Sequence, residues 1–151
     1  AKKREALFDE ITKNAIAYGI ASVSAETIDE INIYEATKVA MKEALKQIEG
    51  KYDLIITDAM KLKCDKDVIP LIKGDAQCLN IAAASILAKV SRDRYLEELD
   101  KQYPQYGFAS HKGYGTKEHL DAIGKYGPIA GVHRKSFKPI KDYYNEQLKL
   151  F

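Results

Sequence analysis

The chain of 151 residues is 46% hydrophobic and 30% charged, which is ordinary for one globular domain that buries a sizeable core. Its net charge of +2 is too small to indicate a polyanionic partner by itself, so a nucleic-acid interpretation depends on where the positive charges lie. No apolar run is long enough for a membrane span or a signal peptide, so we expect a cytoplasmic protein without a membrane partner. Cys64 and Cys78 form no metal or redox motif, so we expect both to be free thiols.

The first third of the chain predicts a helix, a strand and two further helices. Apolar residues at helical spacing predict a helix over 3–17, and the partly alternating segment 18–24 predicts a strand. Ser24 is placed to cap a short helix that follows it. The clearest apolar stripe predicts another helix, which Gly50 ends. The members of this stripe are Ile33, Ala36, Thr37, Ala40, Met41, Ala44, Leu45 and Ile48.

The rest of the chain predicts two strands and three helices. These elements are strands over 52–58 and 68–73, a long helix over 78–102, a helix between Thr116 and Gly127, and a last helix that follows the basic loop 133–139 and ends at Phe151. Pro70 places the second of these strands at a sheet edge, because proline cannot donate to a strand ladder. Helices that alternate with strands indicate an α/β fold.

Asp58 is the first candidate for a functional carboxylate. It ends the apolar segment YDLIITD, and open α/β sheets place their ligand sites at the carboxyl ends of strands. The alternative is an aspartate that merely begins the turn leaving the sheet. The residues around Asp58 leave both interpretations open.

Asp93 is the second candidate. It follows Ile86 and Val90 at helical spacing, so it continues a stripe that faces the protein body. A carboxylate directed inward requires a cation, because removing it from water unpaired is costly. That cation could be a metal ion, or it could be Lys89 or a neighbouring arginine in a salt bridge. Oxygen ligands suit Mg²⁺, although a two-metal site normally draws on three or four carboxylates.

Positive charge and aromatic rings gather in three loops. In HKGYGT, Lys112 could meet a phosphate and the Tyr114 ring could stack on a sugar or base; the alternative is a turn before the Thr116 cap. Lys73 in KGDAQ and the segment HRKSFK add further cations. Each loop is a weak signal singly, but three of them in one domain favour a face that contacts phosphates.

Several of these segments resemble, in chain order, the signature blocks of the ribonuclease HII family, the bacterial type 2 ribonuclease H. The blocks read INIYEATKVAMKEAL, KGDAQCLNIAAASILAKVSRDR, YPQYGFASHKGYGTKEHL and GPIAGVHRKSF, and the similarity runs over roughly residues 1–143. The resemblance implies a ribonuclease H-like mixed sheet flanked by helices. It also implies an endonuclease that uses Mg²⁺ or Mn²⁺ to hydrolyse RNA in RNA/DNA hybrids and single ribonucleotides embedded in duplex DNA.

The resemblance also implies roles for individual residues. Asp58 and Asp93 match two of the family's four catalytic, metal-binding carboxylates. Tyr114 matches the tyrosine that packs on the deoxyribose next to the ribonucleotide. Lys112 and Lys73 are the expected phosphate contacts on the substrate.

The chain departs from the family pattern at its beginning. The Asp-Glu pair and the Gly-Arg-Gly segment of the family's first strand do not occur, so we expect a single domain that lacks the first two strands. Residues 1–128 would form its catalytic portion and 129–151 its C-terminal basic loop and helix. Full-length family members are expected to be monomers, whereas this chain is expected to associate or exchange strands.

Two other functions compete with the nuclease interpretation. With two of its carboxylates absent, the chain could be a catalytically incomplete fragment that at most binds a nucleic-acid duplex. Alternatively, the stripe Ile33–Ile48 could make it an interaction module, which would leave the ordered series of motifs unexplained.

Overall fold

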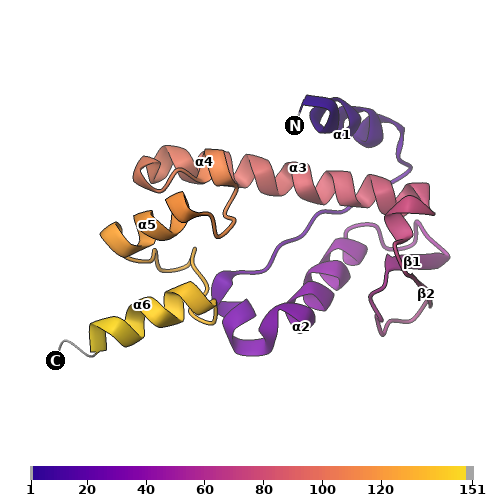
Figure 1. Ribbon diagram of the computed structural model, residues 1–151. Helices are drawn as coiled ribbons and strands as arrows, with labels where there is room; N and C mark the ends of the chain where they lie inside the picture. The colour runs from indigo at the N-terminus through magenta and orange to yellow at the C-terminus, as the bar shows by residue number, and fades with distance from the viewer. Residues whose placement is uncertain (1, 149–151) are drawn as a thin grey trace. The chain divides into compact units, whose positions relative to one another are not determined.

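The computed structural model describes residues 2–148 and has a mixed α/β architecture (Figure 1), which confirms the predicted class. Its helices and strands are α1 Lys2–Asn14, α2 Ala25–Lys46, β1 Leu54–Asp58, β2 Asp67–Leu71, α3 Leu79–Gln102, α4 Phe108–His111, α5 Lys117–Tyr126 and α6 Lys138–Leu148, with short 3-10 helices η1 Gly74–Ala76 and η2 Pro104–Tyr106. Both cysteines are free thiols, as predicted. Among residues 2–148, none of the helices combines the length and apolar character that crossing a membrane requires.

The fold consists of two compact units, each built from two stretches of chain. The first comprises the residues up to Ser22 together with Lys38–Arg92, and the second comprises Val23–Thr37 together with the residues from Asp93 onward. The chain passes between the units three times: between Ser22 and Val23, within α2 and within α3. This division differs from the predicted boundary after residue 128, which stays a prediction.

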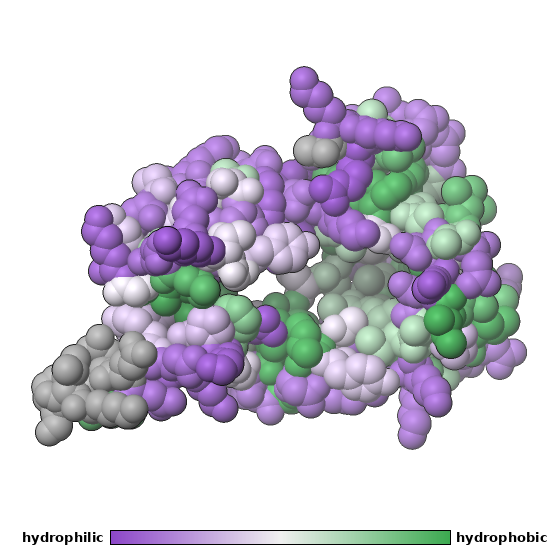
Figure 2. Space-filling model, in the orientation of Figure 1, coloured by the Kyte–Doolittle hydropathy of each residue, from purple (hydrophilic) through white to green (hydrophobic). Residues whose placement is uncertain are grey.

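The sheet of the first unit is a parallel pair of strands. β1 and β2 pair in register from Leu54 opposite Asp67 to Asp58 opposite Leu71, so both predicted strands are confirmed. Pro70 lies on β2, an edge strand as predicted. Hydrophobic side chains reach the surface over this pair (right of Figure 2), and Ile69 and Ile72 are 45% and 78% exposed.

The predicted strand over 18–24 is wrong, because the described residues offer this segment no strand to pair with. Instead, the Gln47 side chain accepts a hydrogen bond from Ile20 N–H at 3.1 Å and donates one to Ile20 C=O at 2.9 Å. The side-chain amide thus satisfies the two backbone groups that a neighbouring strand would otherwise bind. Gly19 allows this approach, because a Cβ there would lie only 2.2 Å from the Ala44 carbonyl oxygen. The preceding helix α1 ends at Asn14, three residues earlier than predicted.

Asn32 divides α2 into the two helical segments that the sequence predicts. Its backbone is left-handed at φ 69°, and its side-chain oxygen accepts hydrogen bonds from Tyr34 N–H at 3.0 Å and Glu35 N–H at 3.1 Å. These bonds cap the second segment. The Ser24 cap of the first segment is also confirmed, since its hydroxyl accepts a hydrogen bond from Thr27 N–H at 3.2 Å.

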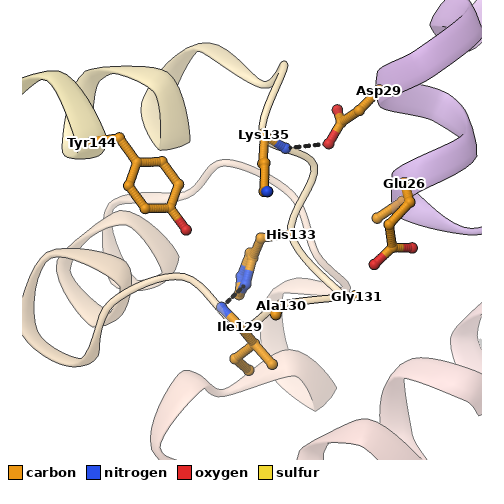
Figure 3. Close-up of a pocket in the computed structure, with 9 residues that line it drawn as sticks. Glu26, Asp29, Ile129, Ala130, Gly131, His133, Lys135 and Tyr144 are labelled. Atoms are coloured by element: carbon orange, nitrogen blue, oxygen red, sulfur yellow. Dashed lines mark hydrogen bonds between the residues drawn. The ribbon is translucent and has the colours of Figure 1, made fainter.

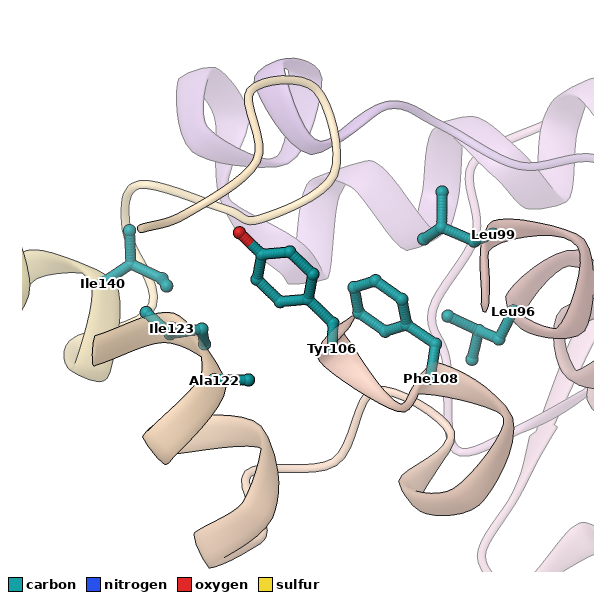
Figure 4. Packing of buried hydrophobic residues seen from close by; sticks show 7 residues of the cluster. All are labelled: Leu96, Leu99, Tyr106, Phe108, Ala122, Ile123 and Ile140. Atoms are coloured by element: carbon teal, nitrogen blue, oxygen red, sulfur yellow. The ribbon is translucent and has the colours of Figure 1, made fainter. Parts of the chain in front are cut away.

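The core of the second unit collects apolar side chains from four segments (Figure 4). It consists of Leu96 and Leu99 from α3, Tyr106 and Phe108 from the turn that follows, Ala122 and Ile123 from α5, and Ile140 from α6. The Tyr106 and Phe108 rings stack with centroids 5.6 Å apart. The Tyr106 hydroxyl donates a hydrogen bond to the Gly127 carbonyl at 2.5 Å. This core anchors the loop that carries Lys112 and Tyr114.

Candidate functional site

Asp58 is the last residue of β1, and its side chain is exposed. One carboxylate oxygen accepts a hydrogen bond from Gly74 N–H at 3.0 Å, which ties the end of β1 to η1 after β2. The other oxygen could bind a cation. Lys73, which is exposed and has a left-handed backbone at φ 53°, directly precedes Gly74. The first unit therefore brings the predicted residues Asp58 and Lys73 to one corner of the sheet.

Asp93 lies on α3 in the second unit, where it is partly buried. Val90, one turn earlier on the same face, is only 2% exposed, which confirms the predicted inward direction of this stripe. Asp58 and Asp93 belong to different units. Among residues 2–148, no group of three or more histidine, cysteine or acidic side chains is arranged to hold a metal ion. The carboxylate oxygens of each aspartate suit the chemistry of a hard cation.

Lys112 folds back toward α3. Its ammonium lies 2.5 Å from a carboxylate oxygen of Glu97, and its side chain is only 22% exposed. The hydrogen bond and charge of Lys112 lower the pKa of Glu97. A phosphate would have to share this ammonium with Glu97, so the predicted role of Lys112 in phosphate binding stays a prediction.

Tyr114 presents its ring outward from a backbone that is held on both sides. The residue is 64% exposed. Its N–H donates to the His111 carbonyl at 3.0 Å, and its own carbonyl accepts from Thr116 N–H at 2.8 Å and from His119 Nδ1 at 2.9 Å. An exposed ring on a restrained backbone is suited to stacking on a nucleotide. Tyr114 and Lys112 thus lie in one loop of the second unit, as the sequence predicts.

The sequence interpretation missed a cluster of the chain's three histidines. The His111 and His119 rings stack at 4.2 Å, and His119 Nε2 lies 3.1 Å from His133 Nε2. Burial and, to a lesser extent, the neighbouring histidines lower the pKa of His133 to about 4. Burial lowers the pKa of His119 as well. The available signal was that every histidine lies in or between the two motifs HKGYGT and HRKSF.

The lowered pKa of His133 predicts that the chain becomes less stable in mild acid. Because His133 titrates at about 4 in the folded chain and about 6.5 when unfolded, the unfolded state binds more protons between these pH values. Stability therefore falls as pH drops through this window, by about 2 kcal/mol between pH 7 and pH 4.5. Urea unfolding at the two pH values measures this difference. A His133→Gln variant serves as control and should show a shallower pH dependence; an unchanged dependence contradicts the assignment.

Asp29 holds the basic loop against the first segment of α2 (Figure 3). Its carboxylate accepts hydrogen bonds from Lys135 N–H at 2.6 Å, Ser136 N–H at 2.9 Å and the Ser136 hydroxyl at 2.5 Å. Partial burial would raise the pKa of Asp29, but these bonds and the charge of Arg134 outweigh it and lower the pKa. Asp29 thus binds two backbone N–H groups of the basic loop. An anion approaching this loop would contact the cationic side chains of the loop. Tyr144 and His133 line the same small pocket of about 110 Å³.

Comparisons with known proteins identify close relatives over most of the chain. A family model described as Ribonuclease HII matches residues 1–140. A protein named Ribonuclease HII from Geobacillus thermodenitrificans is 54% identical over 140 residues, which are 93% of this chain and 54% of that protein. The protein of the same name from Bacillus cytotoxicus is 50% identical over 146 residues, or 97% of this chain and 56% of that protein. The chain spans about half the length of the curated relatives it matches.

Proposed function

The chain belongs to the ribonuclease HII family, and from this premise we propose that its protein is an endonuclease. Its substrates are the RNA strand of RNA/DNA hybrids and single ribonucleotides embedded in duplex DNA. The observation that carries this proposal is the family match over residues 1–140, which includes all the predicted site residues. We also propose a ribonuclease H-like sheet that includes two strands beyond the pair described above.

Two carboxylates of this chain would hold a divalent cation, Mg²⁺ or Mn²⁺. Asp58 would offer the oxygen that Gly74 N–H does not engage, and the Gly74 bond would orient the carboxylate. Asp93 would offer its carboxylate from the inward face of α3. When bound, such a cation would act as a Lewis acid that stabilises developing negative charge at the phosphate. Both aspartates match the oxygen chemistry that these ions prefer.

The remaining predicted residues would hold the substrate. Tyr114 would stack on the sugar at the DNA side of the junction, since its ring is exposed on a restrained backbone. Lys73 would contact a phosphate beside Asp58, and Lys112 would do so while sharing its charge with Glu97. Phosphate contacts of this kind position the duplex, and the tyrosine adds sensitivity to the sugar.

One observation favours a narrower function for the 151 residues taken alone. Within residues 2–148, three metal-ligating side chains do not come together. The chain by itself would then bind a duplex without cleaving it. Incubation of the purified chain with a labelled duplex and Mn²⁺ distinguishes the two: cleavage rejects the narrower function, whereas binding without cleavage supports it.

The test of the proposed function is cleavage of a labelled duplex that contains one ribonucleotide, with an all-DNA duplex of the same sequence as control. The full-length gene product containing these residues should cut the first duplex at the ribonucleotide, leaving a 3′-hydroxyl and a 5′-phosphate, and should leave the second intact. Absence of cleavage in the presence of Mg²⁺ and of Mn²⁺, or equal cleavage of both duplexes, contradicts the proposal.

Tyr114→Ala should lower kcat/KM for this substrate by about tenfold or more, because an aromatic stacking contact contributes about 1–3 kcal/mol. The matched control is Tyr18→Ala, which removes another tyrosine that is 47% exposed and lies in the first unit. Its kcat/KM should stay within about twofold of wild type, as for surface positions away from a site. Equal losses in the two variants would contradict a specific role of Tyr114.

A further inference from the structure

Three buried or partly buried histidines form a cluster beneath the loop that carries Tyr114: His119 and His133 are hydrogen-bonded to each other, and His111 stacks on His119. His111 and His119 are 6% and 3% exposed, and His133 is partly buried. Both ring nitrogens of each histidine have a partner within 3.1 Å. The cluster lies entirely within the second unit.

The backbone partners determine where each imidazole carries its proton, because an N–H only donates and a carbonyl only accepts. Ile129 N–H donates to His133 Nδ1 at 2.8 Å (Figure 3), so neutral His133 carries its proton on Nε2. That proton is donated to His119 Nε2 at 3.1 Å. His119 then carries its own proton on Nδ1 and donates it to the Tyr114 carbonyl at 2.9 Å. The bonds run in one direction from Ile129 to Tyr114.

His111 completes the support from the other side of the loop. Its Nε2–H donates to the Tyr106 carbonyl at 2.7 Å, and its Nδ1 accepts from Gly113 N–H at 3.1 Å. The ring stacks on His119 with an interplanar angle of 13°. Imidazoles therefore bind the backbone of two consecutive residues, Gly113 and Tyr114, while the Tyr114 ring remains exposed.

We propose that His119 and His133 are positioning residues that orient the Tyr114 ring through its backbone carbonyl, so that the C-terminal loop at Ile129 and the substrate-contacting loop are mechanically linked. This inference rests on the proposed function of Tyr114. The residues do not touch the substrate themselves. Their effect on activity must therefore pass through Tyr114, which separates this role from a general contribution to folding.

The first test is the position of the protons in the 151-residue chain. A long-range ¹H–¹⁵N spectrum of the imidazoles at pH 7.5 should show three neutral rings, with His119 protonated at Nδ1 and His111 and His133 at Nε2. A His119 ring that is protonated at Nε2, or charged, breaks the one-directional series and overturns the proposal whatever the activity.

The second test is a double-mutant cycle in the full-length gene product. His119→Phe keeps an aromatic ring but removes the bond to Tyr114, and should lower kcat/KM for the single-ribonucleotide duplex by about tenfold, equivalent to about 1.4 kcal/mol. In a Tyr114→Ala background the same change should cost less than about twofold, because the group it orients is gone. His119→Asn, whose amide can still donate to the Tyr114 carbonyl, should recover most of the loss. Asp121→Asn on exposed α5 surface is the control and should match wild type.

The possible outcomes distinguish the positioning role of His119 and His133 from the proposed substrate contact of Tyr114. If Tyr114→Ala leaves kcat/KM unchanged, the substrate role of Tyr114 fails and the positioning role fails with it. If Tyr114→Ala lowers activity but His119→Phe costs the same factor in both backgrounds, only the positioning proposal is overturned. Loss in the wild-type background alone, with recovery in His119→Asn, supports it.

Discussion

Asp93→Asn in the full-length gene product should lower kcat for a duplex with one embedded ribonucleotide by about a thousandfold or more, equivalent to about 4 kcal/mol of transition-state stabilisation. The asparagine keeps the size of the side chain and one oxygen, but it removes the negative charge that a divalent cation needs from its ligand. Single-turnover cleavage of the labelled duplex in saturating Mn²⁺ measures the loss.

The matched control for Asp93 is Glu98→Gln on the same helix. Glu98 is exposed and pairs with Lys101 at 2.5 Å, an ion pair of the kind that contributes little to stability. This variant removes the same charge without touching the proposed site, so its kcat should stay within about twofold of wild type. Near-normal turnover of Asp93→Asn, or an equal loss in both variants, would reject Asp93 as a ligand.

Ile140→Ala should destabilise the chain by about 2–5 kcal/mol, the range found when a fully buried aliphatic side chain leaves a cavity. Ile140 is 0% exposed and lies in the core formed by α3, α5, α6 and the η2 turn. Because Tyr106 and Phe108 belong to the same core, the loss should loosen the support beneath the Tyr114 loop. Urea unfolding followed by circular dichroism measures the change.

Leu148→Ala provides the control for Ile140, since both aliphatic residues lie on α6. Leu148 is 74% exposed, so its truncation removes little buried area and should change the free energy of unfolding by less than about 0.5 kcal/mol. Similar destabilisation by the two substitutions would mean that α6 contributes through something other than the burial of Ile140.

Local signals predicted most of the elements because their stabilising contacts are themselves local. The Ser24 and Thr116 caps bind N–H groups three residues ahead, and both are confirmed. The strand predicted over 18–24 is wrong for the opposite reason, since a strand depends on a partner elsewhere in the chain. There the partner is the Gln47 side chain, 27 residues from Ile20, and no periodicity in the segment could indicate it.

The candidate site likewise contains features that depend on local sequence and features that depend on distant segments. The positions of Asp58 at a strand end and of Tyr114 in a glycine-flanked loop were predictable from the residues around them, whereas their proposed roles came from the family resemblance. The supporting contacts were not, because they join distant segments: Asp29 binds Ser136 over 107 positions, and the histidine cluster gathers side chains from two helices and a loop. In the sequence alone, the histidines and Asp29 are indistinguishable from ordinary polar residues, because their partners become known only from the fold.

The proposed function requires that Asp58 and Asp93 are both metal ligands. Crystals of the full-length gene product soaked in Mn²⁺ and measured at a wavelength sensitive to manganese locate the ion directly. We expect manganese with carboxylate oxygens of Asp58 and of Asp93 in its first coordination shell, at about 2.0–2.4 Å. Manganese bound elsewhere, in a protein that cleaves the single-ribonucleotide duplex, would contradict it.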